Sequence, residues 1–349
     1  EWLSGTVVRC ALDLEDMQPG NALITIVSGT AVSNGMNVTL VPPPFIHRVV
    51  PSFASVHGGG IIALIGPNLV EGTSCLCHFG EQHRVAGTYI NNTHVQCTAP
   101  RFVLPQLVNL SLSFDGGAFF TNTASFQFIK NPEVISLSPS GGSVQGNTNV
   151  SVKGKGFVLA HSGETASYKC RFGTTAIVDG ELDIDTGIMY CTSPPMLTGT
   201  VHVDISLNGG TDFTDNAIVF EYNALVQFVS ISPTNGPVNG NTMVVVKGSH
   251  FYNSAAMGCL FGSSKSVFAN FINASAIECS APAHVPTTVS IQVTMNGVDY
   301  VTTNTPSSSV YIYSLNPYVT TISPTVAMNN GATVITLTGG NFIFSPDLS

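Results

Sequence analysis

The stretch SISPTNGPVNGNTMVVVKGSHF, which runs from Ser230 to Phe251, decides the fold because the chain carries four versions of it. The other three are SLSPSGGSVQGNTNVSVKGKGF from Ser136, VVPSFASVHGGGIIALIGPNL from Val49 and TISPTVAMNNGATVITLTGGNF from Thr321. Their prolines recur at intervals of 88, 94 and 91 residues, at Pro51, Pro139, Pro233 and Pro324. A fixed internal period indicates a repeated structural module.

Each copy predicts a strand, a loop rich in Pro, Gly and Asn, and a second strand. The first strand ends at the proline because proline has no N–H to donate to a β-ladder. The β-branched run Val244–Val246 then predicts a return to a sheet. Seven residues after each proline stands a glycine, namely Gly58, Gly146, Gly240 and Gly331. Eighteen residues after each proline stands a large apolar residue, namely Leu69, Phe157, Phe251 and Phe342. The pattern predicts an all-β chain.

Cysteine motifs follow three of the copies. Cys-x-Phe-Gly occurs at Cys77–Gly80, Cys170–Gly173 and Cys259–Gly262, and Cys-x-x-Pro occurs at Cys97–Pro100, Cys191–Pro194 and Cys279–Pro282. With the Pro/Gly stretch, this pattern resembles the IPT/TIG domain, which is found in plexins, in receptor ectodomains with many such domains, in some bacterial surface proteins and in Rel-type transcription factors. The resemblance covers nearly the whole chain and implies tandem immunoglobulin-like β-sandwiches.

The composition argues against a nucleic-acid partner. The Rel-type relatives grip DNA phosphate, which requires clustered Lys and Arg. This chain has only eleven basic residues among 349, a net charge of −9 and no basic run. No apolar run is long enough to span a membrane, and Glu1–Leu3 lacks the features of a signal peptide. We therefore expect a processed chain or a piece of a longer one.

Six of the eight cysteines form like-placed pairs 20 or 21 residues apart, namely Cys77 with Cys97, Cys170 with Cys191, and Cys259 with Cys279. If oxidised, each pair stabilises its module by about 3 kcal/mol. Free thiols in a reducing compartment are the alternative, but the repetition favours disulfides and an extracellular or cell-surface location. Cys10 and Cys75 are left over, either as free thiols or in a further disulfide with each other or with a neighbouring chain.

The spacing predicts three complete modules, residues 45–130, 131–223 and 224–314, between two half modules, residues 1–44 and 315–349. Cys10 lies 41 residues before Pro51, much as Cys97 lies 42 before Pro139, so residues 1–44 correspond to the closing strands of a module. Residues 315–349 correspond to the opening strands. The junctions are only a few residues long, which favours a stiff rod.

An open half-sandwich exposes an apolar face and unpaired strand edges. We therefore predict the structural protomer of an extracellular or cell-surface filament, in which the C-terminal half module of one copy is completed by the N-terminal half module of the next. Such head-to-tail contacts grow an open polymer. The residues expected in the assembly strands are Leu23, Ile24, Ile26, Val38, Leu40, Val334, Ile335, Leu337 and Phe342.

The alternative is a ligand-binding segment of a receptor-like ectodomain with many IPT/TIG domains, in which the half modules are the cut edges of a longer array. The filament prediction can be checked by comparing the length of the composite module with that of the intact repeats. The composite module would have 35 residues between Pro324 and Cys10, against 46 to 52 in the intact repeats, so it would lack about a hairpin unless the chain continues. A carbohydrate-binding array is disfavoured by the single Trp, because sugar platforms usually need exposed aromatic rings.

Five Asn-x-Ser/Thr sequons are candidates for N-linked glycans, at Asn37, Asn91, Asn109, Asn149 and Asn273. Chance alone gives about this number in a chain so rich in Asn, Ser and Thr. All five fall at polar positions, so a glycan at each leaves the cores undisturbed, and we expect most to be occupied if the source is eukaryotic.

Two further motifs have an ordinary and a functional interpretation. His57–Gly60 resembles the oxyanion-hole motif of lipases, but it aligns with the repeat glycines and lacks a Gly-x-Ser-x-Gly partner, so we predict a turn. Asp179, Glu181, Asp183 and Asp185 alternate on one strand face and could hold Ca²⁺, but we favour a charged edge that blocks strand pairing. The scattered histidines have no metal-site spacing. We expect no metal, no cofactor and no enzymatic activity.

Overall fold

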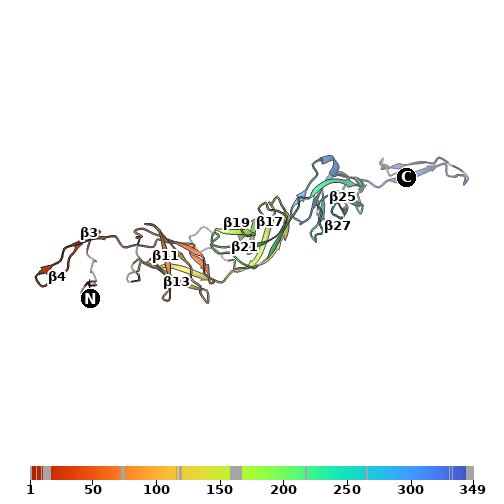
Figure 1. Cartoon of the computed structure of the whole chain (residues 1–349). Helices are drawn as coiled ribbons and strands as arrows, with labels where there is room; N and C mark the ends of the chain where they lie inside the picture. The colour runs from red at the N-terminus through yellow and green to blue at the C-terminus, as the bar shows by residue number, and fades with distance from the viewer. Residues whose placement is uncertain are drawn as a thin grey trace. The chain divides into compact units, whose positions relative to one another are not determined.

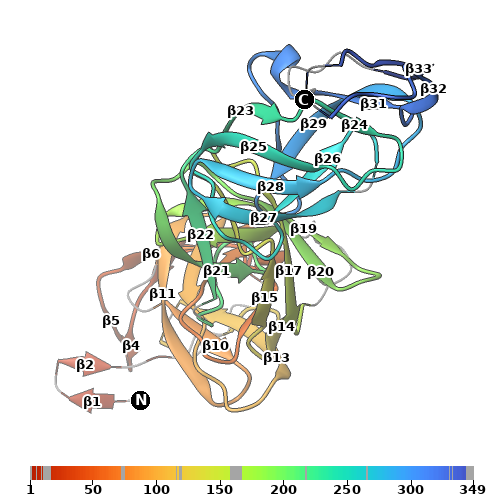
Figure 2. The same cartoon turned by 90° about the vertical axis from the view of Figure 1, so that its right-hand side faces the viewer.

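The computed structural model describes residues 2–4, 6–8, 10, 17–71, 75–114, 116–117, 120–157, 167–216, 218–264, 266–329, 331 and 333–342. The chain divides into two compact units, Glu1–Asn131 and Pro132–Ser349, and each is described by itself (Figures 1 and 2). Within the described ranges, the one helical element is a 3₁₀ turn, η1 (Pro306–Ser309). The all-β prediction is confirmed.

The first unit contains a β-sandwich over residues 48–129. Its strands are β7 (Arg48–Val50), β8 (Phe53–Ser55), β9 (Ile61–Ile65), β10 (Leu76–Phe79), β11 (His83–Asn91), β12 (His94–Thr98), β13 (Gln106–Ser113) and β14 (Ala124–Ile129). They pair in the order β7-β9-β12-β11-β10-β13-β14-β8, and only β8 runs parallel to its neighbour, β14. The first half of β11 pairs with β10 and the second half with β12, so this strand belongs to both layers.

The second unit repeats this arrangement twice. One sandwich has β15 (Glu133–Ser138), β16 (Gly141–Ser143), β17 (Asn149–Lys155), β18 (Tyr168–Phe172), β19 (Ala176–Asp183), β20 (Ile188–Thr192), β21 (Gly199–Ser206) and β22 (Val219–Asn223). The next has β23 (Gln227–Ser232), β24 (Asn235–Pro237), β25 (Met243–Ser249), β26 (Gly258–Phe261), β27 (Val267–Asn273), β28 (Ala276–Ser280), β29 (Thr287–Thr294), β30 (Tyr300–Val301) and β31 (Val310–Ser314). Strand order is the same in all three sandwiches, with β30 added beside β29. We call them the first, second and third modules.

Apolar side chains from both layers meet in one core in each module. In the third module, Val244 and Val246 of β25 face Ile291 and Val293 of β29, and all four are fully buried. Alternation along the strands produces this arrangement, because every second residue of a strand points to the same face. The Cys-x-Phe-Gly motif follows the same rule, since Cys259 and Phe261 are both buried.

The Pro/Gly stretch and the Cys-x-x-Pro motif, which are distant in sequence, touch in space. Gly240 has a φ of +75°, and a Cβ added to it would lie 2.7 Å from the carbonyl oxygen of Ala281 in Cys279–Pro282. Gly58 and Gly146 have the same left-handed φ and the same close approach to their own Cys-x-x-Pro segments. Glycine is required there because it alone combines this φ with the absence of a Cβ. The prolines that anchor the four copies all follow cis peptide bonds.

Both terminal regions contain short antiparallel pairs. They are β1 (Trp2–Ser4) with β2 (Val7–Val8), β3 (Gly20–Ile24) with β6 (Met36–Leu40), β4 (Val27–Ser28) with β5 (Ala31–Val32), and β32 (Tyr318–Ser323) with β33 (Thr336–Gly340). We call β32 and β33 the C-terminal hairpin. Its described side chains are mostly exposed, unlike those of the modules.

Candidate functional site

Each module contains one of the cysteine pairs, and the structure joins all three as disulfides. Their Cα–Cα distances are 6.2 to 6.3 Å, for Cys77–Cys97, Cys170–Cys191 and Cys259–Cys279. The disulfide links the strands on either side of the one that belongs to both layers, such as β10 and β12 on either side of β11. The central strand has a small residue there, because a Cβ on Gly87 would lie 2.9 Å from the Cys77 sulfur.

Of the alternatives that the sequence left open for Cys10 and Cys75, the structure has free thiols at both positions. Cys10 is exposed, whereas Cys75 is half-buried with its sulfur against Gly87, beside the Cys77 sulfur. Burial raises the pKa of the Cys75 thiol. Cys75 therefore lies beside the first module's own disulfide.

All five sequon asparagines are exposed, namely Asn37, Asn91, Asn109, Asn149 and Asn273. Two of them occupy the same place in different modules, at the ends of β11 and β27. The Asn91 side-chain oxygen accepts hydrogen bonds from the Thr93 N–H (2.9 Å) and hydroxyl (2.8 Å). The Asn273 oxygen likewise accepts from the Ser275 N–H (2.8 Å). In both hairpins the side-chain oxygen, not the amide nitrogen, makes these bonds.

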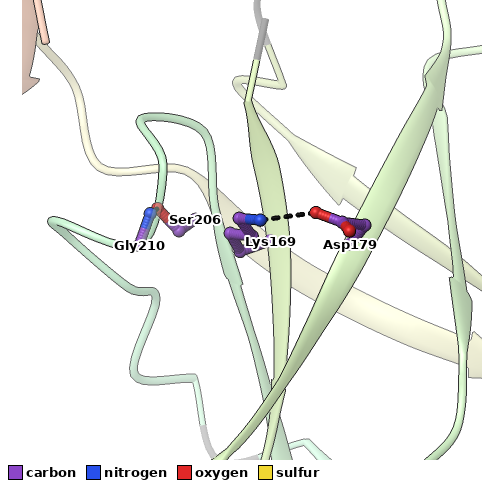
Figure 3. Close-up of polar contacts among 4 residues, drawn as sticks. All are labelled: Lys169, Asp179, Ser206 and Gly210. Carbon is purple, nitrogen blue, oxygen red and sulfur yellow. Dashed lines mark hydrogen bonds and ion pairs between the residues drawn. The ribbon is translucent and has the colours of Figure 1, made fainter.

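The four alternating carboxylates belong to β19 and the turn after it, and two of them, Asp179 and Asp183, have protein partners. Lys169 forms an ion pair with Asp179 (Figure 3). The Asp183 carboxylate accepts the Asp185 N–H at 3.0 Å. Hydrogen bonding, first from the Thr186 hydroxyl and then from backbone N–H groups, lowers the pKa of Asp183. The described residues contain no group of three His, Cys, Asp or Glu side chains placed to hold a metal ion.

The position of β19 supports the charged-edge interpretation over a Ca²⁺ site. Its first half pairs with β18 and its second half with β20, so each half lies at the edge of one layer. Charged side chains at sheet edges discourage unwanted strand addition.

The motif His57–Gly60 is a turn, as predicted, because the Gly58 and Gly59 N–H groups donate to the carbonyl oxygens of Ser55 and Ala99.

The second and third modules meet at a polar junction that the sequence motifs did not reveal. The Thr148 hydroxyl donates to the Asp299 carboxylate at 2.6 Å, and the Asn296 amide nitrogen donates to the Gly141 carbonyl oxygen at 3.1 Å. Thr148 and Gly141 belong to the second module's Pro/Gly stretch, whereas Asn296 and Asp299 belong to the loop after β29 in the third. An Asn-Gly turn signal at Asn296 could have identified the loop, but not its partner.

Tyr252 of the third module lies at the same junction, in an open groove of about 410 Å³ that is also lined by Glu221 of the second module. Burial, followed by the negative charges of Glu221 and Asp299, raises the pKa of Tyr252 to about 12. The phenol is therefore held neutral beside two carboxylates.

No described helix is long and apolar enough to cross a membrane.

Disulfide-bonded β-sandwiches in tandem, with a Pro/Gly stretch packed on a Cys-x-x-Pro motif, define an array of immunoglobulin-like modules. The chain belongs to the IPT/TIG domain family, whose sequence model matches residues 44–128, 132–222 and 227–310. The resemblance inferred from the motifs is thereby confirmed.

Similar curated proteins include Plexin A3 of Danio rerio and Fibrocystin-L of Homo sapiens. Plexin A3 is 23% identical over 61% of this chain and 11% of its own length. Fibrocystin-L is 23% identical over 87% of this chain and 7% of its own length. The chain thus spans a small part of either relative. A solved structure of the full extracellular region of Plexin A4 matches 85% of this chain and 31% of that one, with 16% identity and a TM-score of 0.37.

Proposed function

We propose that this chain is a segment of a receptor-like ectodomain with many IPT/TIG domains, located at the cell surface or in the extracellular space. The observation that carries the proposal is the series of three disulfide-bonded IPT/TIG modules in a chain similar to Plexin A3 and Fibrocystin-L. Structural disulfides persist in oxidising compartments, which supports an extracellular location. In this role the modules act by presenting surfaces to other molecules, without catalysing a reaction.

The comparisons favour this alternative over the filament protomer. The strands predicted for assembly are present, with Leu23 exposed on β3 and Leu337 exposed on β33. Val334 before β33 and Phe342 after it are also exposed. Exposed apolar strands fit either function, so they do not support a filament in particular. Head-to-tail assembly of this chain with its own copies is the competing prediction that an experiment has to exclude.

N-linked glycans complete the proposal. The five sequon asparagines are exposed, and in a secreted chain they would carry sugar on the module surfaces without entering a core. Glycans would also cover part of the polar strand faces and leave the remaining surface for protein partners.

The test is to secrete the chain from animal cells and measure its disulfides, glycans and size. Peptide mapping without reduction should recover the three disulfides, and deglycosylation should lower the mass. Sedimentation velocity should show one species whose size does not grow with concentration. Fibres that lengthen with concentration and disappear in a Leu337→Asp variant would overturn the proposal in favour of the filament protomer.

A further inference from the structure

The hydrogen bonds between the second and third modules support an inference that does not depend on the proposed function. Its central group is the Asp299 carboxylate, which accepts one hydrogen bond from its own loop and one from the neighbouring module. The first comes from the Asn296 amide at 2.7 Å and the second from the Thr148 hydroxyl at 2.6 Å. Asn296 in turn donates to Gly141. The four residues form a closed polar network that spans two modules.

We propose that Thr148 and Gly141 of the second module, with Asn296 and Asp299 of the third, form a latch that holds these two modules together as one rigid body. The latch fixes one relative orientation of the two modules, because both hydrogen bonds between them require one orientation of the Asn296–Asp299 loop. Hydrogen bonds to an ionised carboxylate are shorter and stronger than neutral ones. A junction built from them fixes the angle between modules better than apolar contact does.

The loop is shaped before it meets its partner. The Asn296 side-chain oxygen accepts the N–H groups of Val298 and Asp299 at 3.1 and 2.8 Å, so the loop is rigid and its carboxylate is already oriented. The matching loop of the second module has the same internal design, with the Asn208 amide donating to the Asp212 carboxylate at 3.1 Å. The loop geometry is therefore shared by the second and third modules, and the bond to Thr148 is added at the junction.

The Thr148 hydroxyl that reaches the third module is a buried group. The Thr148 side chain is 0% exposed, although it lies at the end of its module in the Gly-Asn-Thr sequence before β17. Its counterpart in the third module, Thr242, is partly exposed and lies near Tyr311 and Gly236 of its own module. In the first module the matching position is Gly60, which offers no hydroxyl. These three positions provide a matched comparison within one chain.

Apolar contact supports the polar bonds. Val226, Met295 and Val301 of the third module line a narrow space that Gly142 of the second module also borders. A Cβ added to Gly142 would clash with the Thr148 side chain, so the glycine leaves room for Thr148 at the junction. Asn296 and Asp299 are partly buried, so apolar contact covers one side of the latch and the open groove beside Tyr252 borders the other.

The test compares Thr148→Val with Thr242→Val in the full chain. Both replace a threonine by a side chain of the same shape, but only the first removes a donor from the junction. Hydrogen–deuterium exchange should become several-fold faster at residues 141–143 and 296–299 in Thr148→Val and stay unchanged there in Thr242→Val. Exchange within β17 and β20 should keep its protection in Thr148→Val, which shows that the second module stays folded.

A tyrosine titration gives a second, spectroscopic readout. In Thr148→Val, Tyr252 should become solvated and titrate close to the ordinary tyrosine pKa of about 10 instead of near 12, so one more of the nine tyrosines ionises in the lower range. Tyr252→Phe identifies the signal. The proposal is overturned if Thr148→Val matches the unaltered chain in both measurements. It is also overturned if Thr242→Val has the same effect, or if β17 and β20 lose protection as well.

Discussion

The opening hairpin of the third module and the C-terminal hairpin have the same pairing and opposite burial. β23 pairs with β25 from Gln227–Ser249 to Ser232–Val245, and β32 pairs with β33 from Tyr318–Gly340 to Ser323–Thr336, with an irregularity at the matching position of each. Yet Phe251 is 3% exposed while its counterpart Phe342 is 52% exposed. The repeated stretch therefore encodes a hairpin locally, and the rest of the module encodes its burial.

The difference has a simple physical origin. In the third module, strands β26, β29 and β31 supply a second layer, and their side chains cover Val244 and Val246. The counterparts in the C-terminal hairpin, Ile335 and Leu337, are exposed. An isolated two-stranded hairpin is marginally stable in water, because most of the stabilisation comes from apolar surface removed from solvent.

The largest expected effect is at the apolar residue eighteen positions after the proline. Phe251→Ala should lower the free energy of unfolding of the third module by about 3 to 5 kcal/mol, because it leaves a cavity in a packed core. Phe342→Ala should change the stability by less than about 0.5 kcal/mol, as is usual for exposed positions. Denaturant unfolding followed by peptide-resolved hydrogen exchange measures both. Equal losses in the two variants would mean that the C-terminal hairpin is packed in solution.

Removal of the third module's disulfide should have the next largest effect. Cys259→Ala combined with Cys279→Ala should lower the module's free energy of unfolding by about 3 kcal/mol, because the reduced chain regains the entropy of a 20-residue loop. The exchange rates of the C-terminal hairpin should not change. A loss shared by the C-terminal hairpin would contradict the conclusion that its structure is local.

The sequence predicted the fold better than the contacts between its parts. Fixed offsets from Pro233 identified both hairpins and the disulfide partners, because those relations repeat within each module. The Thr148–Asp299 bond joins residues 151 positions apart in different modules, so no repeated offset reveals it. The sequence left the state of Cys10 and Cys75 open because no repeated offset gives either one a partner, and the structure has both as free thiols, with Cys75 packed beside Cys77.

High pH should weaken the modules by a smaller amount. Burial raises the pKa of Tyr313 in β31, and of Tyr222 in the second module, to about 12. Below about pH 10 these phenols are neutral in both the folded and the unfolded chain. Above it the unfolded chain loses its protons first, so stability falls as the pH rises from about 10 to 12. Denaturant midpoints measured over this range check the sign, and Tyr313→Phe should reduce the loss. Stability that stays constant between pH 10 and 12 would show that the pKa values of these phenols are not raised in the folded chain.

The smallest expected effects come from the glycine seven residues after the proline, and they separate backbone shape from packing. Gly240→Ala should destabilise the third module by about 1 kcal/mol or more, because alanine disfavours a φ of +75° and its Cβ would lie 2.7 Å from the Ala281 carbonyl oxygen. Gly331 has no positive φ and no atom within 4 Å of an added Cβ, so Gly331→Ala should be neutral or slightly stabilising. Hydrogen exchange at β25 and β33 reports each site. If Gly331→Ala proved as costly as Gly240→Ala, Gly331 would be closely packed in solution, and the exposed state of the C-terminal hairpin would be refuted.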